Sequence, residues 1–342
     1  MAADGALPTL HPPIEPYETG MLDVGDGQSI YWEASGNPGG KPAVALHGGP
    51  GGGSSPGWRR RFDPDRYRLI QLDQRGCGRS TPHAGDLSTD LLTNTTHHLI
   101  SDLERLRQHL GIDRWLVWGG SWGVTLGLAY AERFPERVSE MVLLSITMTR
   151  PSDVRWLSRD VGRYFPEEWA RFRTGVPEAN RDGDLVVAYD RLLNGQLDPA
   201  VRLQAARDWV AWEDAILSLE EGYVVPNPRW ADERYMVAFA RLVTHYFSHA
   251  AWLGENELLH NAPPADGHPG RPAPWPARPG RTSGRRLAAR AGMAGCRAPL
   301  RQGRPPGRRG NGPSTARGDR PLRLARLTPP SSTARHGSDD GG

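Results

Sequence analysis

Short apolar runs and amphipathic stretches alternate along the first 150 residues. Runs of strand length occupy residues 43–47, 67–73, 115–118 and 138–145. Apolar residues recur at helical spacing within 88–110, and Gly111 follows where such a helix would end. A second helix is predicted after the third run, through Phe134, because Pro135 stops it. Strands that alternate with helices in this way predict an α/β fold whose sheet is mostly parallel, with helices on both faces.

The pattern changes on either side of this alternation. Residues 21–33 predict a β-hairpin around the turn Gly25-Asp26-Gly27. From about residue 150 to 255 the chain becomes helical and rich in tryptophan, with no clear strand. A helical insertion after a strand is predicted to cap the carboxyl edge of the sheet, where such folds bind ligands. We therefore expect an α/β core at 1–149, a helical cap at 150–255 and a tail at 256–342.

The end of the chain differs sharply in composition from the rest. Residues 263–342 carry 16 Arg and 4 Asp, together with 14 Pro and 14 Gly, and lack Val, Ile, Phe, Tyr, Lys and Glu. Residues 1–262 carry 26 Lys and Arg against 35 Asp and Glu, so the net charge of +3 combines −9 and +12. A segment so poor in large apolar residues cannot supply a core and is predicted to be disordered.

Neither a membrane nor a secretory pathway is indicated. No run approaches the roughly 20 apolar residues that a spanning helix needs, and the N-terminus lacks a basic stretch followed by an apolar run. The only cysteines, Cys77 and Cys296, argue against a disulfide framework and predict a cytoplasmic protein. No metal or cofactor is predicted.

A glycine-rich motif carries the candidate chemistry. Gly119-Gly120-Ser121-Trp122-Gly123 has the pattern G-x-S-x-G between a predicted strand and a predicted helix, the setting of the nucleophile elbow in α/β hydrolases. We predict that Ser121 is the nucleophile. The loop 47–51 follows an earlier strand, where this fold places its second oxyanion donor. The backbone N–H groups of Gly49 and Trp122 are therefore expected to bind the oxyanion; plain glycine turns are the alternative.

Four segments together resemble the proline iminopeptidase family, α/β-hydrolase peptidases that remove N-terminal proline. They are HGGPGGG at 47–53, DQRGCGRS at 73–80, GGSWG at 119–123 and PERVSEMVL at 135–143. The resemblance runs from about residue 13 to 262 and implies that Ser121 is the nucleophile, with Gly49 and Trp122 forming the oxyanion hole. It implies that 73–80 braces the elbow. The expected partner is a peptide with N-terminal proline, and neither a membrane nor a nucleic acid is expected to bind.

The resemblance also implies a site for the substrate's amine in the cap. Trp209-Val210-Ala211-Trp212-Glu213 resembles a family segment whose glutamate binds that amine, and a solvated helix residue is the alternative for Glu213. A carboxylate among aromatic rings suits this role, because little water competes for it. A second family glutamate is replaced by Val243, which predicts weaker binding of N-terminal proline or altered specificity.

The acid and the histidine that complete a serine triad are not found by sequence. In this fold they follow the serine in the order Asp, His, and the family carries them in His-Gly-Arg-x-Asp and a later Gly-His, neither of which occurs here. The histidines after Ser121 all lack a fitting context: His245, His249, His260, His268 and His336. The triad Asp and His are therefore left unknown.

A frameshift at about residues 262–266 would explain both the missing residues and the tail. Codons for 266–279, read one nucleotide later, can spell an apolar strand ending in His-Gly-Arg-Leu-Asp. The competing view is that the Arg-rich tail is a genuine arm for nucleic acid or an acidic surface. We favour the frameshift, because the tail has one aromatic residue, Trp275, and no Lys. As written, the chain would then lack its C-terminal strands.

These observations leave three functional hypotheses. The first is a serine exopeptidase that releases N-terminal proline. The second is a catalytically dead or truncated hydrolase fragment, inactive because its triad is incomplete. The third is an esterase or amidase of the same fold.

The frameshift hypothesis makes a prediction about the gene. Resequencing is expected to find an inserted or deleted nucleotide near the codons for residues 262–266. An uninterrupted reading frame, together with an intact protein mass equal to that of the chain as written, would contradict it.

Overall fold

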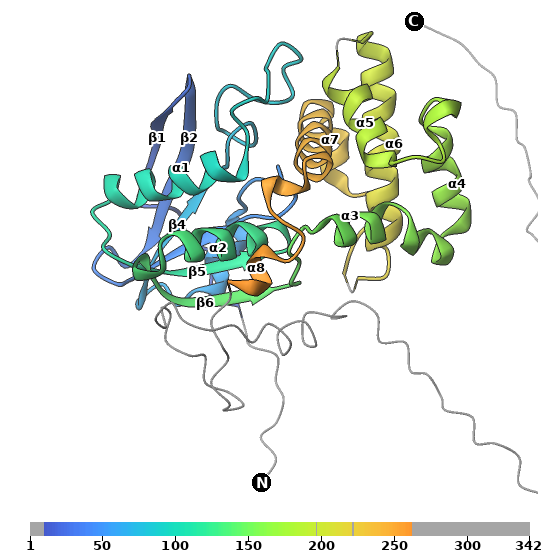
Figure 1. Ribbon diagram of the computed structural model, residues 1–342. Coiled ribbons are helices and arrows are strands. Elements are labelled where there is room, and N and C mark those ends of the chain that lie inside the picture. The colour runs from blue at the N-terminus through green and yellow to red at the C-terminus, as the bar shows by residue number, and fades with distance from the viewer. Residues whose placement is uncertain (1–9, 196, 221, 262–342) are drawn as a thin grey trace, which may run out of the picture. The chain divides into compact units, whose positions relative to one another are not determined.

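The computed structural model describes residues 10–195, 197–220 and 222–261. The predicted disorder of the tail, its missing strands, and the residues Cys296, His268 and His336 lie outside the described residues. The described core contains a six-stranded sheet with the order β1-β2-β4-β3-β5-β6 (Figure 1). Its strands are β1 (Glu18–Gly25), β2 (Gln28–Gly36), β3 (Lys41–Leu46), β4 (Tyr67–Leu72), β5 (Trp115–Gly120) and β6 (Val138–Leu144).

The sheet is mixed rather than wholly parallel. The pairs β3–β4, β3–β5 and β5–β6 are parallel, as predicted for the alternating part of the chain. The hairpin β1–β2 is antiparallel and β2 joins β4 in antiparallel register. Asp26 at the hairpin turn has φ 57°, between Gly25 and Gly27, which also have positive φ. Within the described residues β6 pairs only with β5, and Val142 and Leu144 are exposed along it.

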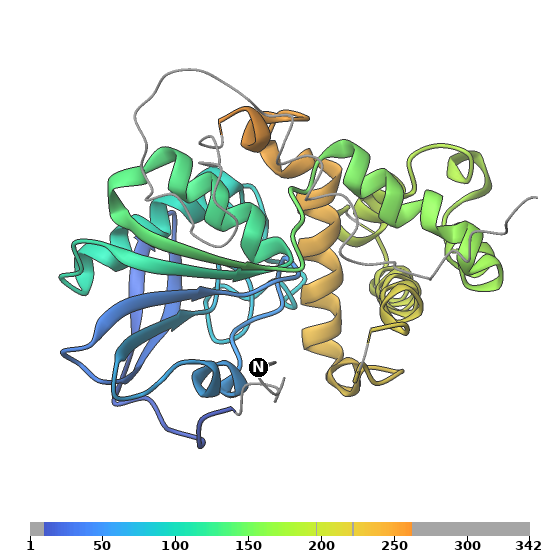
Figure 2. The same ribbon diagram turned by 90° about the horizontal axis from the view of Figure 1, so that it is seen from below.

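One face of the sheet is covered by two helices, α1 (Thr96–His109) and α2 (Trp122–Arg133). The sequence analysis allowed the first helix to begin as early as residue 88, but it begins at Thr96, because the Thr95 hydroxyl accepts a hydrogen bond from the N–H of His98. The other face is not covered by a comparable helix in the described residues. There the 3₁₀ helix η1 (Pro56–Arg61) lies against the sheet (Figure 2). Phe62, which follows it, belongs to a small apolar cluster with residues of the strands.

After β6 the described chain is helical, and the segment from α3 to α7 is called the cap below. Its helices are α3 (Pro151–Ser158), α4 (Pro166–Thr174), α5 (Leu185–Asn194), α6 (Pro199–Leu217) and α7 (Glu233–Ser248). Helix α7 lies between the core and the rest of the cap (Figure 2). Leu242 and Tyr246 belong to the core cluster, whereas Phe239 and Val243 belong to the cap cluster. The short helix α8 (Glu257–His260) returns to pack on α2. Helix α7 is therefore a wall shared by two apolar cores.

Two glycines allow α2 to start directly against the end of β3. A Cβ atom on Gly123 would collide with the carbonyl oxygen of Leu46, and one on Gly119 would collide with that of Gly123. Between these positions, Gly120 has open space around it and an ordinary φ. The close approach fixes where the β5-to-α2 turn lies relative to the loop that follows β3.

Replacing Gly123 with Ala should therefore destabilise the protein, although alanine is the better helix former by about 1 kcal/mol. We expect the clash with backbone to dominate and to lower the free energy of unfolding by about 1–3 kcal/mol. Gly120→Ala is the matched control and should leave stability nearly unchanged, because nothing lies near its Cβ position. Urea unfolding of both variants tests this; equal stabilities would show that the close approach is not a constraint.

Candidate active site

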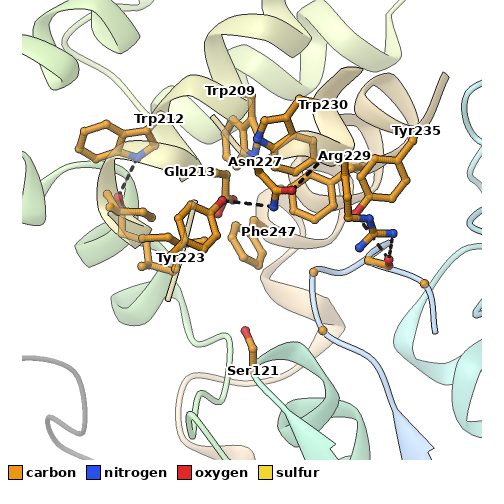
Figure 3. A pocket seen from close by; sticks show the side chains of 18 of the residues that line it. Ser121, Trp209, Trp212, Glu213, Tyr223, Asn227, Arg229, Trp230, Tyr235 and Phe247 are labelled. Carbon is orange, nitrogen blue, oxygen red and sulfur yellow. Dashed lines mark hydrogen bonds between the residues drawn. The ribbon is translucent and has the colours of Figure 1, made fainter. Parts of the chain in front are cut away.

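Ser121 lies on the turn between β5 and α2, the position that the sequence motif predicted. Its φ is 53°, a left-handed conformation that is strained for a serine. Hydrogen bonds hold the turn, since the Ser121 N–H donates to the carbonyl of Leu144 (3.0 Å) and the N–H of Val124 donates to the Ser121 carbonyl (2.8 Å). The side chain is exposed and points into a cavity of about 340 Å³ (Figure 3).

The glycine loop after β3 lies beside Ser121 and is held by a buried histidine. A Cβ on Gly48 would lie 3.3 Å from the Cβ of Ser121. The carbonyl of Gly48 accepts hydrogen bonds from the Nδ1–H of His47 (2.9 Å) and from the N–H of Gly52 (3.0 Å). Burial lowers the pKa of His47, so its ring is neutral, and its Nε2 accepts from the N–H of Gln74 (3.0 Å).

These contacts orient the peptide between Gly48 and Gly49. In a trans peptide the N–H lies opposite the carbonyl, so the engaged Gly48 carbonyl directs the Gly49 N–H away from His47. Trp122 is the first residue of α2, where an N–H has no acceptor within the helix. Its indole N–H donates to Gln74 (2.9 Å), which fixes the start of the helix. Neither the Gly49 nor the Trp122 amide has a hydrogen-bond partner in the described part of the chain.

The segment 73–80 forms a hydrogen-bond network around the buried carboxylate of Asp73. Asp73 accepts hydrogen bonds from the N–H of Ser54 (2.7 Å) and from the Nε of Arg79 (2.8 Å). Burial opposes ionisation of Asp73, but these hydrogen bonds outweigh it and lower its pKa. Because Ser54 follows the glycine loop directly, the network fastens the far end of that loop.

Glu213 lies on α6, across the cavity from Ser121 (Figure 3). Its neighbours on the cavity wall are mostly aromatic, namely Trp209, Trp212, Tyr223, Trp230, Tyr235, Phe239 and Phe247. Burial among these rings raises the pKa of Glu213 to about 7, with a smaller contribution from the neighbouring charge of Asp214. The indole N–H of Trp209 lies close enough to favour the charged form, yet it makes no hydrogen bond of normal geometry in the described residues.

The next residue, Asp214, has a different role that the sequence analysis missed. Its carboxylate is buried and accepts hydrogen bonds from the Tyr223 hydroxyl (2.8 Å), the Trp230 indole (2.9 Å) and the Asn227 N–H (3.3 Å). These three donors lie on the segment between α6 and α7, which therefore closes one side of the cavity. The hydrogen bonds of Asp214 hold this segment in place, whereas no side chain donates a normal hydrogen bond to Glu213 in the described residues.

Val243, the residue that replaces an expected glutamate, is fully buried in the cap cluster. It lies one helical turn from both Phe239 and Phe247 on α7, and those two side chains line the cavity. The position therefore lies directly behind the aromatic wall, where valine adds apolar packing and no charge.

The described histidines after Ser121 do not bond to it. His245 is buried, and its Nε2 is 3.0 Å from the carbonyl of Asn94. His249 stacks on Trp252 with ring centroids 4.8 Å apart. In the ranges described, the hydroxyl of Ser121 has no hydrogen-bond partner, so the structure assigns no triad base among these residues.

No group of three or more His, Cys, Asp or Glu side chains among residues 10–195, 197–220 and 222–261 is arranged to hold a metal ion. In that same part of the chain, no helix is both long and apolar enough to cross a membrane.

Comparison with known proteins identifies the family. A family model described as alpha/beta hydrolase fold matches residues 42–248. A probable proline iminopeptidase of Streptomyces coelicolor is 53% identical over 247 residues, which cover 72% of this chain and 75% of that protein. The chain belongs to the proline iminopeptidase family. It is by homology a serine hydrolase of this type, and the resemblance inferred from the four motifs is confirmed.

Other proline iminopeptidases are also similar. That of Arabidopsis thaliana is 43% identical over 259 residues, which cover 74% of this chain and 65% of its own length, slightly less than two thirds. The crystal structure of proline iminopeptidase from Mycobacterium smegmatis matches 67% of this chain and 70% of that chain, with 23% identity and a TM-score of 0.42.

The raised pKa of Glu213 predicts how its substitution affects stability. An ionised Glu213 is disfavoured in the folded state, so the wild type loses stability as pH rises from about 4.5 to about 7. Glu213→Gln should therefore be more stable than wild type at pH 8, by up to about 3 kcal/mol, and nearly equal to it at pH 4. Urea unfolding at both pH values measures this. Glu220→Gln, an exposed position after α6, is the control; a pH-independent difference for Glu213→Gln would contradict the assignment.

Proposed function

We propose that this proline iminopeptidase homologue is a serine exopeptidase that releases N-terminal proline from peptides. One observation carries the proposal: Ser121 and a carboxylate of raised pKa, Glu213, face the same aromatic-walled cavity. A protonated amine beside Glu213 would restore its charged form, because an opposite charge favours ionisation. An exopeptidase needs such a group at a fixed place relative to its nucleophile.

The chemistry would follow acyl transfer. The Ser121 hydroxyl attacks the carbonyl carbon after the N-terminal proline and gives its proton to a general base. The carbonyl oxygen becomes an oxyanion that accepts hydrogen bonds from the Gly49 and Trp122 N–H groups, each worth about 3 kcal/mol in comparable sites. Collapse breaks the peptide bond and the leaving amine takes up the proton. Water then hydrolyses the prolyl ester. We assign the base to no described residue.

Val243 bears on the strength of amine binding. With valine behind the aromatic wall, Glu213 is the only carboxylate among the described residues that line the cavity. We infer that one charge rather than two holds the amine, so affinity for N-terminal proline is lower than a pair of carboxylates would give. The peptide partner and a cytoplasmic location belong to the same proposal.

The inactive-fragment hypothesis remains a second candidate. It is favoured by one observation, the absence of a hydrogen-bond partner for the Ser121 hydroxyl within the described residues. The esterase or amidase hypothesis differs only in the leaving group, since the same serine and oxyanion donors would serve it.

Hydrolysis of a proline arylamide by the purified full chain separates these candidates. Wild type should release the arylamine, Ser121→Ala should not, and N-acetylproline arylamide should resist cleavage because it has no amine to bind. Glu213→Gln should raise KM at least tenfold, whereas Glu220→Gln should leave KM unchanged. An unchanged KM in Glu213→Gln would contradict the amine site. No turnover by wild type would favour the fragment, and faster cleavage of the acetylated substrate would favour the esterase or amidase.

A further inference from the structure

The cavity contains one cationic side chain that the proposed function does not use. Among the described lining residues, Arg229 is the only cation and Glu213 the only carboxylate. In Figure 3 the two side chains lie well apart, with Arg229 beside the glycine loop and Ser121 below both. A cavity with one charge of each sign suits a ligand that also carries one charge of each sign.

Two contacts fix the guanidinium of Arg229 beside the oxyanion loop. One of its terminal nitrogens donates to the carbonyl of Gly52 (2.6 Å), and the guanidinium lies 3.9 Å from the centroid of the Tyr235 ring. The backbone is fixed as well, since the Arg229 N–H donates to the Asn227 side chain (3.1 Å). This segment is the one that Asp214 anchors. These contacts therefore fix the position of both the guanidinium and the backbone of Arg229.

The remaining donors of this guanidinium are available to a ligand. In the part of the chain that the structure describes, no carboxylate lies within ion-pair distance of Arg229, and its Nε and second terminal nitrogen make no hydrogen bond. An arginine in this state presents the planar fork that binds a carboxylate through two hydrogen bonds. A peptide's C-terminal carboxylate has this shape and charge.

The size of the cavity limits which peptide could reach both charges. A sphere of the same volume, about 340 Å³, would be about 9 Å across, whereas two extended residues span at most about 7 Å and three about 11 Å. A cavity of this volume is also near the lower end of the range for ligand pockets, about 300–1,000 Å³. A dipeptide is therefore of a size that this cavity can hold.

We propose that Arg229 binds the C-terminal carboxylate of a dipeptide whose N-terminal amine is held by Glu213, so that the preferred substrates are dipeptides with free ends. The order of groups agrees, because amine, scissile carbonyl and carboxylate would face Glu213, Ser121 and Arg229 in turn. This inference rests on the proposed function and narrows its substrate class.

Binding to the full-length Ser121→Ala chain tests the proposal without requiring turnover. The ligands are prolyl-alanine and prolyl-alanine amide, which differ only in the carboxylate, and titration calorimetry gives each Kd. We expect the acid to bind at least tenfold more tightly than the amide. Adding Arg229→Gln should reduce this ratio to less than twofold while leaving the Kd of the amide nearly unchanged. Adding Arg171→Gln, an exposed arginine of α4 outside the cavity, should leave the ratio intact.

The outcomes separate this inference from the function on which it rests. Equal Kd values for acid and amide, or a ratio that survives Arg229→Gln, would overturn the dipeptide proposal and leave the exopeptidase proposal standing. Loss of both ligands only in the Arg229→Gln chain would show that Arg229 holds the loop and would also overturn it. Failure of both ligands to bind the Ser121→Ala chain would overturn the proposed function together with the inference.

Discussion

The site depends on the close approach of α2 to the end of β3. No side chain can be accommodated between Gly123 and the Leu46 carbonyl, so the helix begins where the strand ends. That contact forces Ser121 into its strained turn and sets it beside Gly48. The serine and the glycine loop come from segments about seventy residues apart, and this close backbone contact brings them together. Polar groups then refine the arrangement through His47 and Gln74.

Two adjacent acidic residues of α6 have different roles, one structural and one proposed to bind substrate. The Asp214 carboxylate accepts hydrogen bonds from three donors of the segment before α7, and that segment forms one wall of the cavity. Glu213 points into the cavity and has a pKa of about 7, because its aromatic surroundings offer little to a negative charge. In the empty site the ionised form of this carboxylate is disfavoured, and a bound cation would stabilise it. An amine-binding position requires this property. The aromatic side chains of the cavity wall would therefore contribute to recognition of the amine by excluding water from Glu213.

The elements that local sequence determines were predictable, and the long-range contacts were not. The strands, the hairpin turn and the serine elbow follow from apolar runs and glycines, which act within a few residues. The first helix is shorter than its apolar spacing allowed, because Thr95 caps it. The position of η1 could not be predicted, because a buried strand shows that its face is covered but not which element covers it. Glu213 was found only by family resemblance, and its raised pKa needs the three-dimensional packing of rings.

Arg229 shows most clearly why the sequence was insufficient. Its guanidinium donates a hydrogen bond to the carbonyl of Gly52, which is 177 residues away in the sequence. A single arginine after a proline gives no local indication of such a contact. We propose that Ser121, the glycine loop and Glu213 form one peptide site, and a crystal structure of the Ser121→Ala chain with a bound N-terminal proline peptide is the decisive test. We expect the amine at the Glu213 carboxylate and the first carbonyl oxygen within hydrogen-bond distance of the Gly49 and Trp122 N–H groups. A peptide bound with its amine away from Glu213, or its carbonyl away from both amides, would contradict it.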